Sequence, residues 1–249
     1  MSEVIAVTSG KGGMGKTALC AALAWQLHNS GHKVLCIDCD DGFGDLDAYL
    51  GFGHLPAITY PEVCRGLYPM DRAAKENTHS LRFLAAPMRD EHIRQEEMAA
   101  LLQQAREHFD YILLDHPKFP LADRHILVTM PNPVAIRAAR RKADELEVQG
   151  AKNVRLLVNG IDTKQMAAMG LTVDDVMDQV GLPLLGIVPF DPTVTLSCAA
   201  GKSLQGKKGA AAAVERIARR IQGIHTTIPN RLCPGRMWAS APTSELTHQ

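Results

Sequence analysis

The chain has 249 residues with 27 basic and 27 acidic side chains, so its formal net charge is zero. A neutral chain has no global field that attracts nucleic acid or anionic lipid, which argues against nucleic acid as a partner. At 46% hydrophobic and 22% charged residues, the composition is that of a globular protein, and no apolar run approaches the ~18 residues of a transmembrane helix. The length fits one large α/β domain.

Residues 10–17 carry the most informative motif. The run Gly10-Lys11-Gly12-Gly13-Met14-Gly15-Lys16-Thr17 fits the phosphate-loop pattern G-x-x-x-x-G-K-[ST] at every fixed position. An apolar run over 4–7 predicts a buried strand before the loop, and a helical run over 17–28 follows it with its N-terminal dipole toward the phosphates. Backbone N–H groups and Lys16 are suited to the phosphates of ATP, and the Thr17 hydroxyl to Mg²⁺. The predicted nucleotide-binding residues of this segment are Gly10, Lys11, Gly12, Gly13, Met14, Gly15, Lys16, Thr17 and Ala18.

Lys11 is a second lysine that the ordinary pattern does not require. With it, the run from Lys11 to Thr17 resembles the deviant phosphate loop (deviant Walker A) of the MinD/ParA ATPases. The resemblance implies that Lys11 reaches across a dimer interface to the nucleotide of the partner subunit. A solvated loop lysine is the alternative, but a long cation beside a polyphosphate favours a phosphate contact.

An acidic segment follows the next predicted strand, over 33–38. Carboxylates gather in its run Asp38-Cys39-Asp40-Asp41-Gly42-Phe43-Gly44-Asp45-Leu46-Asp47, and an α/β sheet places its ligand chemistry at such a strand end. The segment resembles the first switch of the family, which implies that Asp40 polarises the attacking water. Asp38 is then expected to hold the water shell of Mg²⁺ or to position the loop. An acidic loop without catalytic use is the alternative.

The apolar strand predicted over 111–115 ends in Asp115, the form of a Walker B element that binds Mg²⁺ through water. The predicted catalytic residues are thus Lys11, Lys16 and Asp40, and the predicted metal site comprises Thr17, Asp38 and Asp115. The family continues with a P-A-G segment whose glycine N–H senses the γ-phosphate. This chain has Phe119 in place of that glycine, and the next strand follows unusually soon, so the family's sensor of the nucleotide state is not matched here.

Alternating apolar runs and helical spacings predict the remaining elements. Strands are expected over 81–86, 125–130, 154–159 and 184–188, and helices over 61–66, 91–108, 133–150, 171–180 and 209–223. The family resemblance implies that Asn159, at a strand end, reads the adenine edge, although an asparagine in a strand-end turn is nearly as good an explanation. It also implies that the segment Pro189-Phe190-Asp191 packs on the purine through Pro189 and Asp191.

The last predicted helix, over 209–223, has an apolar face of small residues and a face with Arg216, Arg219 and Arg220. We expect it to pack on the domain, and weak, reversible contact with an anionic membrane is the alternative. From Thr226 the chain lacks periodicity and contains several prolines, so the predicted organisation is an ATPase domain over 1–225 and a disordered tail over 226–249.

Six cysteines are scattered along the chain, and only Cys36 and Cys39 have C-x-x-C spacing. Cys36 lies in an apolar strand, so we interpret it as a core residue rather than half of a redox or metal pair. Reduced, scattered cysteines favour a cytoplasmic location, and the strand that starts directly after the N-terminus predicts no cleavable signal peptide.

The alternation of strands and helices predicts an α/β fold with a doubly wound, mainly parallel sheet and helices on both faces, the P-loop NTPase architecture. The resemblance covers about residues 3 to 222. It implies an ATPase that dimerises with ATP between its subunits, hydrolyses it slowly as a timer, and recruits a division inhibitor at the membrane to place the division site. Three alternatives remain: a ParA-like partition or cargo-positioning ATPase, a metal-centre maturation ATPase, and a scaffold that binds nucleotide without hydrolysing it.

Overall fold

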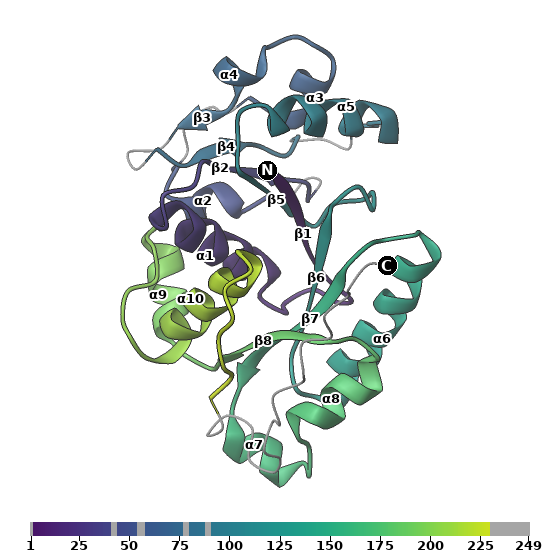
Figure 1. Ribbon diagram of the computed structural model, residues 1–249, viewed down its shortest axis with the longest axis vertical. Helices are drawn as coiled ribbons and strands as arrows, with labels where there is room; N and C mark the ends of the chain where they lie inside the picture. The colour runs from purple at the N-terminus through teal and green to yellow at the C-terminus, as the bar shows by residue number, and fades with distance from the viewer. Residues whose placement is uncertain (1, 41–43, 54–57, 77–79, 88–90, 230–249) are drawn as a thin grey trace, which may run out of the picture.

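The computed structural model describes residues 2–40, 44–53, 58–76, 80–87 and 91–229. In these residues one sheet has the strand order β3-β4-β2-β5-β1-β6-β7-β8, and neighbouring strands are parallel except for the antiparallel pair β3 and β4. The predicted doubly wound sheet is therefore confirmed (Figure 1). The strands are β1 (Glu3–Ser9), β2 (Val34–Asp38), β3 (Lys75–Glu76), β4 (Arg82–Leu84), β5 (Tyr111–Asp115), β6 (Arg124–Thr129), β7 (Val154–Ile161) and β8 (Leu184–Pro189).

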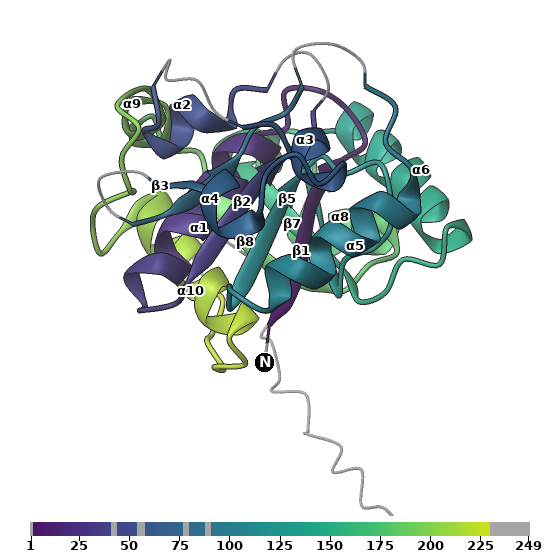
Figure 2. The ribbon, with the colours of Figure 1, turned by 90° about the horizontal axis from the view of Figure 1, so that it is seen from above.

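Helices cover both faces of the sheet (Figures 1 and 2). One face carries α1 (Lys16–Asn29), α2 (Leu46–Leu50), α9 (Thr193–Ala199) and α10 (Gly209–Ile221). The other face carries α3 (Tyr60–Cys64), α4 (Met70–Ala73), α5 (Gln95–Arg106), α6 (Pro133–Val148), α7 (Thr163–Ala168) and α8 (Val173–Val180). The short elements β3, α2, α4, α7 and α9 were not predicted, because segments this short form only when tertiary contacts support them.

The central strand β1 shows why the fold needs two covered faces. Ile5 and Val7 belong to the core under α1 and α10, whereas Val4 and Ala6 belong to the core under α3, α4 and α5. Successive side chains of a strand point to opposite faces, so a run of four apolar residues is buried only if both faces are covered. A third core lies between β6, β7 and the helices α6 and α8.

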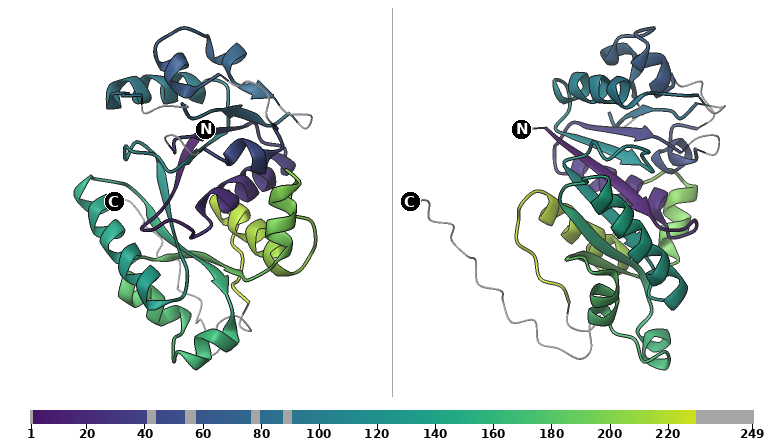
Figure 3. Two further views of the ribbon diagram at one scale, coloured as in Figure 1. Left: turned by 180° about the vertical axis from the view of Figure 1, so that it is seen from behind. Right: turned by 90° about the vertical axis from the view of Figure 1, so that its right-hand side faces the viewer.

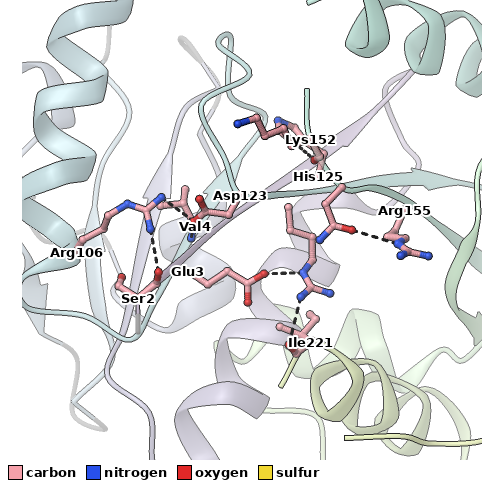
Figure 4. A network of polar contacts seen from close by, with 11 residues as sticks. Ser2, Glu3, Val4, Arg106, Asp123, His125, Lys152, Arg155 and Ile221 are labelled. Atoms are coloured by element: carbon pink, nitrogen blue, oxygen red, sulfur yellow. Dashed lines mark hydrogen bonds and ion pairs between the residues drawn. The ribbon is translucent and has the colours of Figure 1, made fainter. Parts of the chain in front are cut away.

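A network of charged residues ties together the amino ends of the central strands, at the edge opposite to the predicted site (Figure 4). Asp123 accepts a hydrogen bond from the backbone N–H of Val4 (2.8 Å) and pairs with Arg106 (2.6 Å). Arg124 pairs with Glu3 at 2.7 Å. The contacts join β1, α5 and β6 and leave the carboxyl ends of the strands free for ligand chemistry.

The last helix, α10, packs on the domain as expected. Its apolar face is buried against α1 and β8. Arg220 donates to the carbonyl oxygen of Leu185 at 2.6 Å and to Thr226, so this arginine holds the open edge of β8 rather than facing solvent. Ile228 packs on the third core, and the predicted tail beyond Pro229 lies outside the described residues. No helix within the described ranges combines the length and hydropathy needed to cross a bilayer.

Candidate nucleotide site

The candidate site lies at the carboxyl ends of the strands, around the loop that joins β1 to α1 (Figure 3). Gly13 and Gly15 have left-handed φ angles of 77° and 81°, which side chains rarely adopt. A Cβ on Gly10 would lie 2.2 Å from the carbonyl oxygen of Ala138 in α6, so this glycine is needed for packing. Nothing lies within 4 Å of a Cβ at Gly12, which leaves that part of the loop open.

Lys16 and Asp40, predicted separately as phosphate-binding and water-polarising residues, form an ion pair. Lys16 Nζ lies 2.8 Å from Asp40 Oδ2, and the two side chains are 14% and 35% exposed. Burial lowers the pKa of Lys16, but the hydrogen bond to Asp40 and the negative charges of Asp115, Asp40 and Asp38 raise it, and the net shift is upward. Lys16 is therefore positively charged, and its partner is Asp40, the carboxylate predicted to polarise the attacking water.

The predicted metal-binding carboxylates are neighbours, because Asp38 on β2 is in register with Asp115 on β5. They are 2% and 1% exposed. Burial raises the pKa of Asp38 to about 7, helped by the charge of Asp115 and opposed by hydrogen bonds from the backbone of Asp40 and Leu46. Burial likewise raises the pKa of Asp115 to about 6, opposed by Lys16 and by a hydrogen bond from Thr17. A cation between them would relieve this electrostatic cost.

These residues fit Mg²⁺. The described residues supply no hydrogen bond to Asp115 Oδ1, although that oxygen is buried. Two carboxylates and the Thr17 hydroxyl provide the hard oxygen ligands that Mg²⁺ prefers, directly or through its bound waters. Thr17 already donates to Asp115, so the three residues predicted for the metal come together in one place.

The segment after Asp115, called here the second switch because it stands where the family has its P-A-G segment, is short and held at both ends. His116 has φ 55°, a conformation uncommon for a non-glycine residue, and its N–H donates to the Val7 carbonyl at 2.9 Å. Phe119 packs on the core under α5, and Asp123 N–H donates to the Val4 carbonyl at 2.9 Å. A segment anchored in this way has little freedom to follow a γ-phosphate.

Asn159 reaches the phosphate loop from β7. Its Nδ2 donates to the Met14 carbonyl at 3.0 Å, and a Cβ on Gly15 would lie 2.5 Å from that nitrogen. Asn159 thus supports the loop, and its predicted contact with adenine stays a prediction. Lys11 is exposed on the same loop, and its carbonyl oxygen accepts a hydrogen bond of 2.8 Å from the Ser9 hydroxyl.

Asp191, which follows Pro189 and the exposed Phe190, uses its carboxylate to hold backbone. Its Oδ2 accepts from Ala210 N (2.9 Å) and its Oδ1 from Thr193 N (3.0 Å). The bonds from Ala210 and from the Thr193 hydroxyl lower the pKa of Asp191. Both oxygens therefore already have backbone partners, so a purine contact here would be made by packing, as the family resemblance implies.

Sequence reasoning missed Gly44 as part of this site. A Cβ on Gly44 would lie 2.5 Å from Asp38 Oδ2, so only glycine lets the chain pass so close to the buried carboxylate. A glycine within an acidic run after a strand was the available signal, but its partner Asp38 could be identified only once the chain was folded.

The cysteines form no metal site in the described part of the chain. Cys36 belongs to the core on the α1 face and Cys39 to the core on the opposite face, and both are buried. Burial raises the pKa of Cys36 well above its usual range, which makes it unreactive. No group of three or more His, Cys, Asp or Glu residues within the described ranges is arranged to hold a metal ion.

Comparisons with known proteins agree with this geometry. A family model described as "ParA: NUBPL iron-transfer P-loop NTPase" matches residues 1–222. A protein of Nephroselmis olivacea that carries the name septum site-determining protein MinD is 34% identical over 96% of this chain and 93% of its own length. The Synechocystis septum site-determining protein MinD is 31% identical over 93% of this chain and 97% of its own.

A solved structure from Aquifex aeolicus, described as the MinC:MinD cell division protein complex, superposes with a TM-score of 0.83 at 31% identity, covering 92% of this chain and 99% of that one. Sequence and fold agree over nearly the whole length of both proteins. The chain is therefore a P-loop ATPase of the MinD/ParA family.

Proposed function

We propose that this MinD-like ATPase binds ATP with Mg²⁺, dimerises around the nucleotide, and uses slow hydrolysis to time its part in placing the division site. The observation that carries the proposal is the convergence of Lys16, Asp40, Asp38 and Asp115 beside one phosphate loop. Two further supports are the near full-length similarity to MinD proteins and the uninterrupted phosphate-loop motif.

In the proposed reaction, the loop N–H groups and Lys16 bind the phosphates, so Lys16 must first leave Asp40. The freed Asp40 carboxylate then orients a water molecule in line with the γ-phosphorus and takes its proton. The water oxygen bonds to the phosphorus as the bond to the bridging oxygen breaks, and ADP and phosphate leave. Thr17, Asp38 and Asp115 would hold Mg²⁺, which would supply positive charge against the phosphates when bound. Charge stabilisation by these fixed groups is usually the largest contribution to such catalysis.

The proposed dimer explains Lys11, because no contact given by the described residues requires a lysine at this position. An exposed ammonium on the phosphate loop is placed to reach the nucleotide of a second subunit, as the family resemblance implies. We further propose a protein partner of the division-inhibitor type, because the Aquifex relative was solved in a MinC:MinD complex.

Turnover is proposed to be low, because the second switch lacks the mobile glycine and is anchored by Phe119 and Asp123. Loss of one such donor typically lowers the rate by about 10²–10³. We propose a cytoplasmic location. The buried apolar face of α10 leaves that helix nothing to insert into lipid, so membrane contact, if made, is weak and electrostatic.

Two of the alternatives lose support. Neutral net charge argues against a partition ATPase that binds DNA, and the separated Cys36 and Cys39 argue against metal-centre maturation. The non-hydrolysing scaffold remains the competing function. A protein that does not hydrolyse ATP needs no mobile second switch, and the second switch here is anchored.

Calorimetry and phosphate release test the proposal together. We expect Lys16→Ala to abolish Mg-ATP binding and Lys164→Ala, an exposed control in α7, to leave it unchanged. Light scattering should show a dimer with a slowly hydrolysed ATP analogue and a monomer with ADP, and Lys11→Ala should remain monomeric with both. No turnover above the Lys16→Ala background would favour the scaffold instead.

A further inference from the structure

The first-switch helix α2 and helix α9 meet through two glycines, and Figure 2 shows the helices side by side. A Cβ on Gly51 would lie 2.5 Å from the Gly201 carbonyl oxygen, and a Cβ on Gly201 would lie 2.4 Å from the Gly51 Cα. Their φ angles are 78° and 58°. Because the opposing atoms are backbone, no side chain can move aside, and only glycine at both positions allows this approach.

The other end of α2 is fixed by Asp38. Its Oδ2 accepts from Leu46 N, the first residue of α2, at 3.2 Å, and its Oδ1 accepts from Asp40 N at 3.0 Å. The side chain is 2% exposed, so water does not compete for these bonds. One buried carboxylate therefore ties the backbone of Asp40 to the start of α2.

A helix as short as α2, with five residues, does not hold its own position. Leu46 and Leu50 are buried in the core with α1, which fixes the depth of the helix. At its C-terminal cap, Gly51 contacts the backbone of Gly201, so this end of α2 cannot move closer to the end of α9. The backbone at Gly201 is thus one of the contacts that fix the position of the first switch.

Helix α9 is fixed at its own start by Asp191, which accepts hydrogen bonds from Thr193 N and Ala210 N. Asp191 belongs to the segment predicted to pack on the purine. The first switch and the purine segment are therefore joined through α9 by a route outside the phosphate loop.

We propose that Gly201, through its contact with Gly51, is a positioning residue for the first-switch carboxylates. Displacing α2 pulls on Leu46, hence on Asp38 and on the backbone of Asp40, and moves the Asp40 carboxylate off the line of attack. The inference rests on the proposed hydrolysis by Asp40. Phosphate binding itself uses the loop and is not displaced.

A matched pair of variants tests this positioning. Gly201→Ala introduces both a left-handed alanine and a backbone clash, whereas Gly170→Ala, with φ 62° and nothing within 4 Å of its Cβ, introduces only the left-handed alanine. We expect kcat to fall by about tenfold or more in Gly201→Ala, with the Kd for Mg-ATP within about fivefold of the parent because a displaced Asp40 also competes less for Lys16. Gly170→Ala should stay within about twofold of the parent in both quantities. Equal turnover in the two variants would overturn the proposal.

Amide hydrogen exchange gives a second test that needs no hydrolysis and no substitution at Gly201. Asp38→Asn leaves one acceptor oxygen where Asp38 has two, so the bonds from Leu46 N and Asp40 N cannot both be kept. Exchange should then accelerate in α2 and, through Gly51 and Gly201, in α9, while α7 keeps the parent rate. Faster exchange in α2 with unchanged exchange in α9 would show that the glycine contact transmits nothing. A parent enzyme without turnover would instead refute the proposed function and leave this exchange result standing.

Discussion

Replacing Asp40 with asparagine should separate nucleotide binding from hydrolysis, because Asp40 forms an ion pair with Lys16 and is also the carboxylate of the proposed hydrolysis. The ion pair, at 2.8 Å, must break before Lys16 can bind phosphate. Asparagine keeps the shape of the side chain but removes the charge that competes for the ammonium. We therefore expect Asp40→Asn to bind Mg-ATP more tightly than the parent while hydrolysing it more slowly.

The size of the effect follows from the exposure of the pair. The Asp40 side chain is 35% exposed, so solvent screens the interaction and its worth is on the order of 0–1 kcal/mol. Removing the competitor should thus lower the Kd by up to about fivefold, since 1.4 kcal/mol corresponds to about a factor of ten. The gain should shrink as salt is added, because screening weakens the pair in the parent.

Isothermal calorimetry with a slowly hydrolysed ATP analogue and Mg²⁺ measures the affinity, and phosphate release measures turnover. Asp45→Asn is the matched control, because Asp45 is an exposed acid near the site that makes no side-chain cap bond to α2. An affinity for Asp40→Asn that is unchanged, weaker, or no tighter than that of Asp45→Asn would refute the reasoning that Asp40 competes with phosphate for Lys16.

Three further substitutions probe the loop, the sheet edge and a buried histidine. Gly10→Ala should abolish Mg-ATP binding in calorimetry, because the added Cβ clashes with the backbone of α6. Gly12→Ala is the control and should retain binding, because its Cβ has no atom within 4 Å. Equal affinities of the two variants would contradict this prediction. Arg220→Ala should lower the free energy of urea unfolding by about 1–3 kcal/mol, because it removes the hydrogen-bond donor to the Leu185 carbonyl in β8. The control Arg219→Ala, at an exposed position, should lower it by less than about 0.5 kcal/mol. Similar losses in the two variants would refute a stabilising role of Arg220 at β8. Burial lowers the pKa of His125 below 6.5, so below pH 6.5 the unfolded chain takes up a proton that the native chain does not, and stability falls. Between pH 7.5 and 5.5 the parent should therefore lose more unfolding free energy than His125→Asn, and an equal loss would exclude His125 as the cause.

Local pattern was enough to predict much of this protein. The phosphate loop is contiguous, so its residues and their chemistry are visible without a structure. The long elements were also predictable: the helix expected over 133–150 is α6 (Pro133–Val148), and the strand expected over 111–115 is β5. Apolar runs bounded by turn residues, and apolar residues at helical spacing, arise from burial of one or two faces, which the chain must encode locally.

The short elements were not predictable, because their stability comes from distant contacts. The five-residue helix α2 lies in an acidic run without helical periodicity and is held by Asp38 and by Gly201, which is 150 residues from Gly51. Helix α9 has no buried residue of its own, and Asp191, which holds its start, is itself fixed by Ala210, 19 residues further along the chain. A sequence window around either helix contains too little of this information.

The sequence by itself therefore determined the nucleotide loop, the parallel sheet and the identity of the charged residues at the strand ends. Only the tertiary structure decided how those residues are used. The order of β2, β5 and β1 in the sheet brings Asp38 beside Asp115 and Asp40 onto Lys16, and the packing of α10 on β8 brings Arg220 to the edge of that strand. The physical reason is that a local pattern records which face of an element is buried, whereas a pair distant in sequence forms only after strand order and register are set.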